Sequence, residues 1–280
     1  MTENHADRTH VGLSGWDYPG WKGDFYPLGL PARARLQYVA ERFDTVEINA
    51  SFYALQDSAS YQRWYDATPN RFLFALKGGR YITHLKRLRG VEPGLANFFA
   101  SGPLALREKL GPVLWQLPAN LTFDAALIDE FLSLLPRSTV EAGALAGRHD
   151  DKLRYAPYLA VDRDQPMFHV LEVRHRSYDN ERFYQLLSAR GVACVISDSP
   201  TWPQLDRRTS AHTYVRLHGH TQLYASGYSS RNLNSWALRC KQWASEGPVF
   251  VYFDNDARGR APHDALGLMS RLGKAWQPAQ

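Results

Sequence analysis

The feature that most constrains the fold is the regular alternation of short apolar segments with segments of helical periodicity. Eight segments have the length and apolar content of β-strands, at residues 11–16, 45–51, 72–77, 112–117, 169–175, 193–198, 214–219 and 249–254. Helices are predicted at residues 32–42, 58–66, 95–110, 124–135, 180–190, 232–245 and 262–272. Such alternation favours parallel pairing, so we predict an α/β fold of the TIM-type (β/α)8 barrel class. A doubly wound sheet is the alternative.

The chain is predicted to form a single domain. Its 280 residues suit one barrel of about 250 residues. We place that domain at residues 11–273, between a polar N-terminal tail (1–10) and a C-terminal tail (274–280). Residues 136–165 are rich in Arg, Asp and Gly and longer than a usual connection, so we expect an irregular insertion between strands four and five.

Three of the predicted strands carry charge at alternating positions near their carboxyl ends. The pairs are Glu172 and Arg174, Arg216 and His218, and Asp254 and Asp256. Alternate residues of a strand share a face, so each pair points one way and the apolar residues between them point the other. An isolated ion is costly in an ordinary core, whereas barrel sites form at the carboxyl ends of the strands. The pattern therefore predicts a polar site at the mouth of the barrel.

We assign roles within this site by side-chain chemistry. Glu172 and Asp254 are candidate catalytic acids or bases, with His218 in proton transfer. Lys77, Arg174 and Arg216 are candidates to bind an anion, because strand-seven and strand-eight loops of such barrels often hold phosphate. The alternative is that Arg216 forms a buried ion network with Glu172 or Asp254. Further candidates for substrate binding are Trp16, Glu47, Asn49, His84, Gln116, Asp198 and Tyr224.

Two points are left open by the sequence: the direction of the His175 side chain and the presence of a divalent metal. His175 has the opposite parity to Glu172, so it points either to the site or to a helix. Carboxylate and imidazole groups suit a divalent metal. The residues with that chemistry are Glu47, Asn49, Glu172, Asp198, His218 and Asp254. Pairing of these acids with basic side chains is the alternative, and we predict no other cofactor.

Short catalytic motifs are absent from the sequence. It contains no His-Glu-x-x-His metal motif, no Gly-x-Ser-x-Gly elbow and no glycine-rich phosphate loop. A serine-triad hydrolase and a nucleoside-triphosphatase of the phosphate-loop type are therefore disfavoured.

Composition bounds the partners and the compartment. The net charge of +5, from 33 basic and 28 acidic residues, favours anionic ligands, with nucleic acid as an alternative. Cys194 and Cys240 lie in apolar or helix-like segments, where cysteines are usually buried and reduced. No secretory signal or apolar run of about 18 residues is visible, so we expect a cytoplasmic protein without a membrane partner.

Seven sequence blocks resemble one known family. They include GWDYPGWKGDFYP at residues 15–27, FDTVEINASFY at 43–53, GPVLWQLP at 111–118, EVRH at 172–175, YVRLHG at 214–219 and YFDND at 252–256. A further block comprises Ile82 to His84 with Arg87 and Leu88. Together they are similar to the YecE-like family, also called domain of unknown function 72. Tyr178 departs from that pattern, which usually has Trp there. The resemblance implies a TIM-type barrel and supplies no reaction.

The sequence thus favours an enzyme that acts on a phosphate- or carboxylate-bearing small molecule, of hydrolase, lyase or isomerase character. A protein that binds or processes nucleic acid is the second hypothesis, and a non-catalytic interaction module is the third.

Overall fold

The computed structural model describes residues 8–274, so residues 1–7 and 275–280 of the predicted tails lie outside the described residues. The first strand begins at Thr9, and His10 is also part of it, although we assigned both residues to the N-terminal tail.

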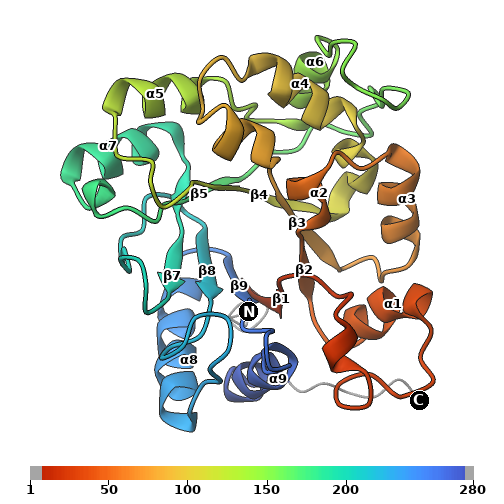
Figure 1. The fold of residues 1–280 in the computed structure, drawn as a ribbon, viewed down its shortest axis with the longest axis vertical. Coiled ribbons are helices and arrows are strands. Elements are labelled where there is room, and N and C mark those ends of the chain that lie inside the picture. The colour runs from red at the N-terminus through yellow and green to blue at the C-terminus, as the bar shows by residue number, and fades with distance from the viewer. Residues whose placement is uncertain (1–7, 275–280) are drawn as a thin grey trace.

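The strands form one parallel sheet that closes into a barrel (Figure 1). Their order is β6-β5-β4-β3-β2-β1-β9-β8-β7. The bounds are β1 Thr9–Leu13, β2 Thr45–Ile48, β3 Leu73–Lys77, β4 Leu110–Gln116, β5 His169–Glu172, β6 Ala193–Cys194, β7 Ile196–Asp198, β8 Thr213–Leu217 and β9 Val249–Phe253. β6 and β7 are the two halves of the predicted strand 193–198, interrupted at Val195. The first half pairs with β5 and the second with β8, which closes the ring. The predicted TIM-type barrel is confirmed.

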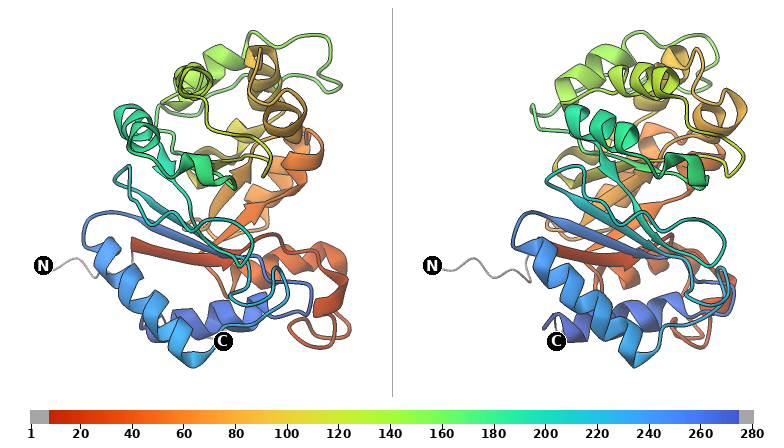
Figure 2. Two further views of the ribbon diagram at one scale, coloured as in Figure 1. Left: turned by 60° about the vertical axis from the view of Figure 1, so that its left-hand side comes forward. Right: turned by 90° about the vertical axis from the view of Figure 1, so that its left-hand side faces the viewer.

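Helices surround the strands, and Figure 2 shows α8 and α9 packed together outside β1 and β9. The α-helices are α1 Arg35–Ala40, α2 Ala50–Tyr53, α3 Ser58–Asp66, α4 Glu92–Ala100, α5 Ala125–Ser133, α6 Thr139–Ala146, α7 Glu181–Arg190, α8 Ser230–Ala244 and α9 Ala261–Arg271. Shorter helical turns are η2 Pro19–Trp21, η3 Ala32–Ala34, η4 Tyr81–Leu85, η5 Pro103–Lys109 and η6 Arg176–Tyr178. No helix within residues 8–274 is long and apolar enough to cross a membrane.

Besides the divided strand 193–198, three predicted segments differ in kind from the structure. The predicted strand 45–51 ends at Ile48, and Ala50 and Ser51 belong to α2. The predicted helix 95–110 is two elements, α4 and η5, because Gly102 at φ 139° and Pro103 interrupt it. The insertion 136–165, expected to be irregular, contains α6. The Ser138 hydroxyl accepts a hydrogen bond from the Glu141 backbone N–H, as in a helix N-cap. α6 packs beside α4, as Figure 1 shows.

Alternation along the strands separates two apolar regions. Inward-facing side chains fill the barrel interior as one cluster of Ala75, Leu114, Val170, Ala193, Val195, Tyr214, Phe250 and Tyr252. Their neighbours, such as Trp115, Leu171 and Val251, instead pack in the larger clusters outside the ring. Cys194 and Cys240 are buried and free, as predicted.

Candidate active site

A layer of polar side chains lies directly above the apolar interior of the barrel. Six inward-facing strand residues are each followed, two positions later, by a polar residue that shares their face. These polar residues are Lys77, Gln116, Glu172, Ser197, Arg216 and Asp254. Since the strands are parallel, all of them lie at the carboxyl end of the ring.

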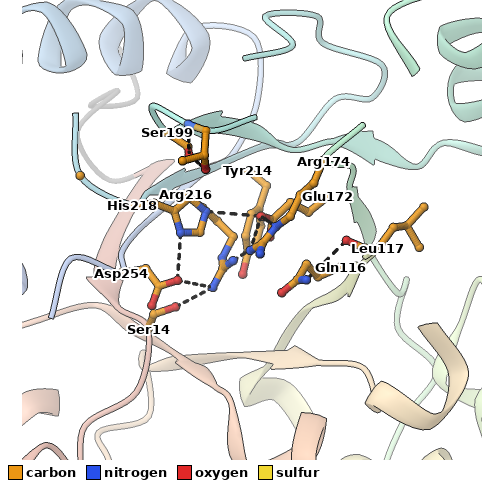
Figure 3. Close-up of polar contacts among 12 residues, drawn as sticks. Ser14, Gln116, Leu117, Glu172, Arg174, Ser199, Tyr214, Arg216, His218 and Asp254 are labelled. Atoms are coloured by element: carbon orange, nitrogen blue, oxygen red, sulfur yellow. Dashed lines mark hydrogen bonds and ion pairs between the residues drawn. The ribbon is translucent and has the colours of Figure 1, made fainter. Parts of the chain in front are cut away.

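Arg216 of β8 is the centre of this layer, and its side chain is completely buried. Its Nη1 donates to Glu172 Oε2 at 2.6 Å, and its Nε and Nη2 donate to the two carboxylate oxygens of Glu47 at 3.1 and 2.7 Å. Nη2 also reaches Asp254 Oδ2 and Ser14 Oγ, at 3.1 and 3.0 Å. Figure 3 shows Asp254 and Ser14 on one side of the guanidinium and Glu172 on another. All three nitrogens of Arg216 are therefore occupied by the protein itself.

Two carboxylates of this cluster, those of Glu172 and Asp254, are stabilised as anions. Burial alone would raise the pKa of Glu172, but Arg174 and Arg216 outweigh it and hold that pKa well below its usual value. Burial likewise opposes ionisation of Asp254, yet Arg216 and a hydrogen bond with His218 lower its pKa. Tyr214 donates to Glu47 Oε2 at 2.7 Å and completes the polar contacts beneath the guanidinium. The buried-network alternative for Arg216 therefore describes the arrangement in the structure.

His218, also on the inner face, lies between two carboxylates. Its Nδ1 is 3.0 Å from Asp254 Oδ2, and its Nε2 is 3.4 Å from Glu172 Oε1. The rings of Trp202 and Tyr224 stand edge-on to the imidazole, with centroids at 5.1 and 5.6 Å. Tyr224 has φ 59°, an uncommon value for a residue other than glycine, and such backbone strain clusters at functional sites.

Lys77, at the end of β3, differs from the arginines because it has no acidic partner. Its side chain is nearly buried, and Nζ lies 4.4 Å from the centroid of the Phe52 ring. Within residues 8–274, Nζ makes no hydrogen bond or ion pair, and it is not among the enclosed polar atoms that lack a partner. Burial, followed by the charge of Arg216, lowers the pKa of Lys77 to about 8, although nearby carboxylates oppose this shift.

His84 and Gln116 lie beside Lys77. His84 belongs to η4, a π-helical turn of the kind often found at functional sites. Its ring contacts Phe52 edge-on at 5.1 Å, and its Nε2 is 3.4 Å from Gln116 Nε2. Burial and then Lys77, Arg174, Arg80 and Arg87 lower the pKa of His84 to about 4. We call this side of the mouth (Lys77, His84, Gln116 and Arg174) the cationic side, because the charges of Lys77 and Arg174 contribute to the lowered pKa of His84.

Arg174 connects the buried cluster to an open cavity. Its Nε and Nη2 donate to Glu172 Oε1 at 3.0 and 2.9 Å, and its guanidinium stacks 4.0 Å from the Trp202 ring. The cavity, of about 430 Å³, is lined by Arg174, His175, Arg176, Pro200, Thr201, Trp202 and Pro203. The mouth thus has a recess bordered by basic side chains.

Four other predicted residues lie at or beyond the edge of the cluster. Asp198 contacts His220 Nδ1 at 3.2 Å rather than Arg216. The Asn49 carboxamide oxygen is buried and has no hydrogen-bond partner within residues 8–274. His175 turns to Ser177, as its parity allowed, and caps η6. Trp16 packs edge-on against Trp64 of α3, with ring centroids 5.5 Å apart.

Asp256 shares its predicted face with Asp254 but is in a different environment. Both of its carboxylate oxygens are buried, and within residues 8–274 neither makes a hydrogen bond of ordinary geometry. Burial, followed by the charge of Asp254, raises the pKa of Asp256 well above its usual value, although the Tyr18 hydroxyl and the Trp21 indole N–H oppose this shift. Asp256 therefore differs from Asp254 and Glu172, whose pKa values are lowered.

Sequence reasoning missed Ser14, Phe52, Trp202 and Tyr214, all of which contact the predicted site residues. Tyr214 had a detectable signal, since it lies two residues before Arg216 on the same face. Among residues 8–274, no group of three His, Cys, Asp or Glu side chains is arranged to hold a metal ion. The acids that we considered as ligands instead face arginine or histidine.

A closed ring of parallel strands with a charged carboxyl-terminal mouth defines the protein as a TIM-type barrel. The chain belongs to the DUF72 family, described as a protein of unknown function, whose model matches residues 10–280.

Relatives agree with this assignment. The UPF0759 protein YunF of Bacillus subtilis is 24% identical over 294 residues, which cover 94% of each chain. The UPF0759 protein YecE of Escherichia coli is 32% identical over 112 residues, or 40% of this chain and 38% of that one. The crystal structure of a DUF72 family protein from Thermotoga maritima is 25% identical, with a TM-score of 0.76, and the match covers 95% of this chain and 99% of that one.

Proposed function

We propose that the mouth of the barrel binds a small molecule that carries a phosphate or carboxylate group and acts on it as an enzyme. The observation that carries this proposal is the nearly buried Lys77 ammonium, which has no carboxylate partner among the described residues. An unpaired cation in a low-dielectric site is costly, and an anionic ligand would remove that cost.

The two sides of the mouth would have different roles, anion binding on one side and proton exchange on the other. On the cationic side, Lys77 and Arg174 attract the anion, and Gln116 offers an amide N–H₂ group. On the opposite side, Asp254 is partly exposed, at 17%, and contacts His218, so it is placed to exchange protons with a bound molecule. Arg216 serves this site indirectly, by holding Glu47, Glu172 and Asp254 in place.

Calorimetric titration with inorganic phosphate and with malonate tests the proposal. Arg174→Gln should weaken binding of at least one of the two anions about tenfold, the effect of losing about 1.4 kcal/mol. Arg190→Gln is the matched control, because Arg190 pairs with Asp129 at the end of α7 and lies away from the mouth. Binding that Arg174→Gln leaves unchanged, or no binding of either anion, would contradict the proposal.

An aromatic and basic rim favours nucleic acid as the second candidate ligand. Tyr53 and Tyr81 are 70% and 44% exposed, and Tyr81 lies beside Arg80 at the start of η4. Stacking on such rings together with phosphate contacts is typical of single-strand binding. The nucleic-acid candidate would be favoured if the protein bound an oligothymidine with an affinity that falls steeply as salt is added, and bound neither phosphate nor malonate.

A further inference from the structure

Two buried lysines of the protein, Lys109 and Lys77, differ in the hydrogen-bond acceptors around their ammonium groups. Lys109 is 1% exposed, and its Nζ donates to the carbonyl oxygens of Tyr65 and Thr68 at 2.6 and 2.7 Å and to Thr68 Oγ1 at 3.2 Å. Its three N–H groups are thus all engaged. Lys77 has no such acceptor among residues 8–274, and its Nζ at the mouth of the barrel is not fully enclosed. Lys109 therefore has a structural role, because its ammonium group is held by three hydrogen bonds, whereas no such bonds hold the ammonium group of Lys77 among the described residues.

The surroundings of Lys77 favour an amine that can lose its proton. Phe52 packs on Nζ, and the Arg216 guanidinium lies on the same inner face. The charged groups that face it from other elements are Glu47, Glu172, Asp254 and Arg216, with His84 beside it. The carboxylates are already bound to Arg216, so none of them holds the Lys77 ammonium by a direct contact. The pKa of Lys77, about 8, agrees with this arrangement.

We propose that Lys77 is a nucleophile that forms a Schiff base with an aldehyde or ketone whose phosphate or carboxylate group binds near Arg174. This inference rests on the proposed function and narrows its substrate class to anionic carbonyl compounds. A lysine amine that is desolvated or next to another cation is suited to this chemistry.

The reaction balances without an oxidant or another co-reactant. The free amine of Lys77 attacks the carbonyl carbon, the carbonyl oxygen gains a proton, and the nitrogen loses one, which gives a carbinolamine. The carbinolamine hydroxyl then takes up the proton that the Lys77 ammonium released when it became the free amine. The hydroxyl leaves as water, and the nitrogen lone pair forms the C=N bond. The product is one iminium and one water. The iminium keeps the positive charge of the original ammonium, so the surrounding carboxylates remain balanced.

Reductive trapping of the wild-type protein tests the inference. Pyruvate, an anionic ketone, and acetone, a neutral ketone, are each added with cyanoborohydride at pH 7, and modified lysines are mapped by mass spectrometry. At this pH a lysine of pKa about 8 has about 300-fold more free amine than one at 10.5. We therefore expect pyruvate to modify Lys77 at least tenfold faster than exposed Lys86, with Lys109 unmodified.

Variants separate the amine chemistry from the anion site. Lys77→Arg removes the primary amine, so it should abolish trapping at this position. Lys86→Arg, at an exposed position, should change neither trapping at Lys77 nor binding of the anion identified by calorimetry. If an anion binds but Lys77 reacts no faster than Lys86, the Schiff base is wrong and the anion site stands. If Lys77 reacts rapidly with acetone and pyruvate alike, the nucleophile is supported and the anion site is contradicted.

Discussion

At the scale of single residues, the two positively charged side chains Arg216 and Lys77 at the mouth of the barrel have different environments. Arg216 donates through all three nitrogens to protein acceptors, and its side chain is completely buried. Lys77, in the same layer, has no acidic partner among residues 8–274. A fully paired ion cluster and an unpaired cation therefore lie side by side, and substitutions should separate the structural role of the first from the proposed ligand-binding role of the second.

Arg216→Met should destabilise the fold. Removing one member of a buried ion cluster leaves carboxylates without their counter-charge, which costs about 3–5 kcal/mol. Arg207→Met is the control, because Arg207 pairs with Glu181 in an exposed contact that contributes at most about 1 kcal/mol. Urea unfolding measures both. An Arg216 variant within about 1 kcal/mol of wild type would show that the cluster is not structural.

His169 should make the protein sensitive to acid. It accepts a hydrogen bond from Trp115 Nε1 at 3.1 Å and donates to the Pro136 carbonyl at 2.7 Å, so protonation would break the first bond. Burial lowers its pKa from 6.5 to about 4. The unfolded chain binds the proton more tightly, so this stability is complete above pH 6.5 and is lost as pH falls towards 4. The loss amounts to about 3 kcal/mol.

The free energy of unfolding of wild type and His169→Gln, measured from pH 7.5 to pH 4, tests this expectation. The variant should lose less stability across that range, because glutamine does not titrate. Equal losses in both proteins would assign the acid sensitivity to other groups.

At the scale of elements, the interruption between β6 and β7 is where the barrel closes. Thr209, in the loop before β8, forms hydrogen bonds with the backbone at β6. Its Oγ1 accepts a hydrogen bond from the Cys194 N–H at 2.8 Å and donates one to the Val192 carbonyl oxygen at 2.7 Å. A side chain thus replaces ladder hydrogen bonds at this position.

Thr209→Val should cost about 1–3 kcal/mol, because it leaves a buried N–H and a buried carbonyl unpaired at nearly constant volume. Thr201→Val, in an exposed loop, should change stability by less than about 0.5 kcal/mol. Amide exchange should also become faster at Cys194. Unchanged stability and unchanged exchange at Cys194 would show that these hydrogen bonds are dispensable.

The elements also show what could be predicted from sequence. Strand parity placed Glu172, Arg216 and Asp254 correctly on one face, because side-chain direction depends only on local alternation. The Ser138 and Glu141 cap of α6 was present in the sequence and was overlooked. The break at Val195 was not predictable, since Val195 lies within a continuous apolar run from Val192 to Ile196. Ser14, which follows β1, contacts Arg216 only because the ring of strands closes. Strand alternation in a single sequence does not show which residues of distant strands become neighbours in this way.

At the scale of the whole molecule, two hollows lie at opposite ends of the barrel. Besides the recess at the mouth, a cavity of about 300 Å³ lies between α5 and α7 and is lined by Arg137, His169 and Arg190, among others. In TIM barrels chemistry belongs to the carboxyl ends of the strands and the amino ends serve stability. We therefore expect anion binding to depend on position rather than on the net charge of +5.

Arg137→Gln combined with Arg190→Gln should leave the affinity for phosphate or malonate within about twofold of wild type, although the double variant loses two positive charges. Arg174→Gln, which removes one, should weaken it about tenfold. Calorimetry at two salt concentrations measures both. A larger effect from the double variant would indicate that general charge attraction, and not the mouth, determines binding.

Lys77 lies at the mouth of the barrel as a partly desolvated cation that has no ion-pair partner among the described residues. A titration of the Lys77 side-chain ¹⁵N or ¹³C resonances, assigned with Lys77→Arg, measures this state directly. We expect a pKa of about 8 for Lys77 in the free protein and a higher value when a bound anion stabilises the ammonium. A pKa near the ordinary 10.5, unchanged by phosphate or malonate, would contradict it.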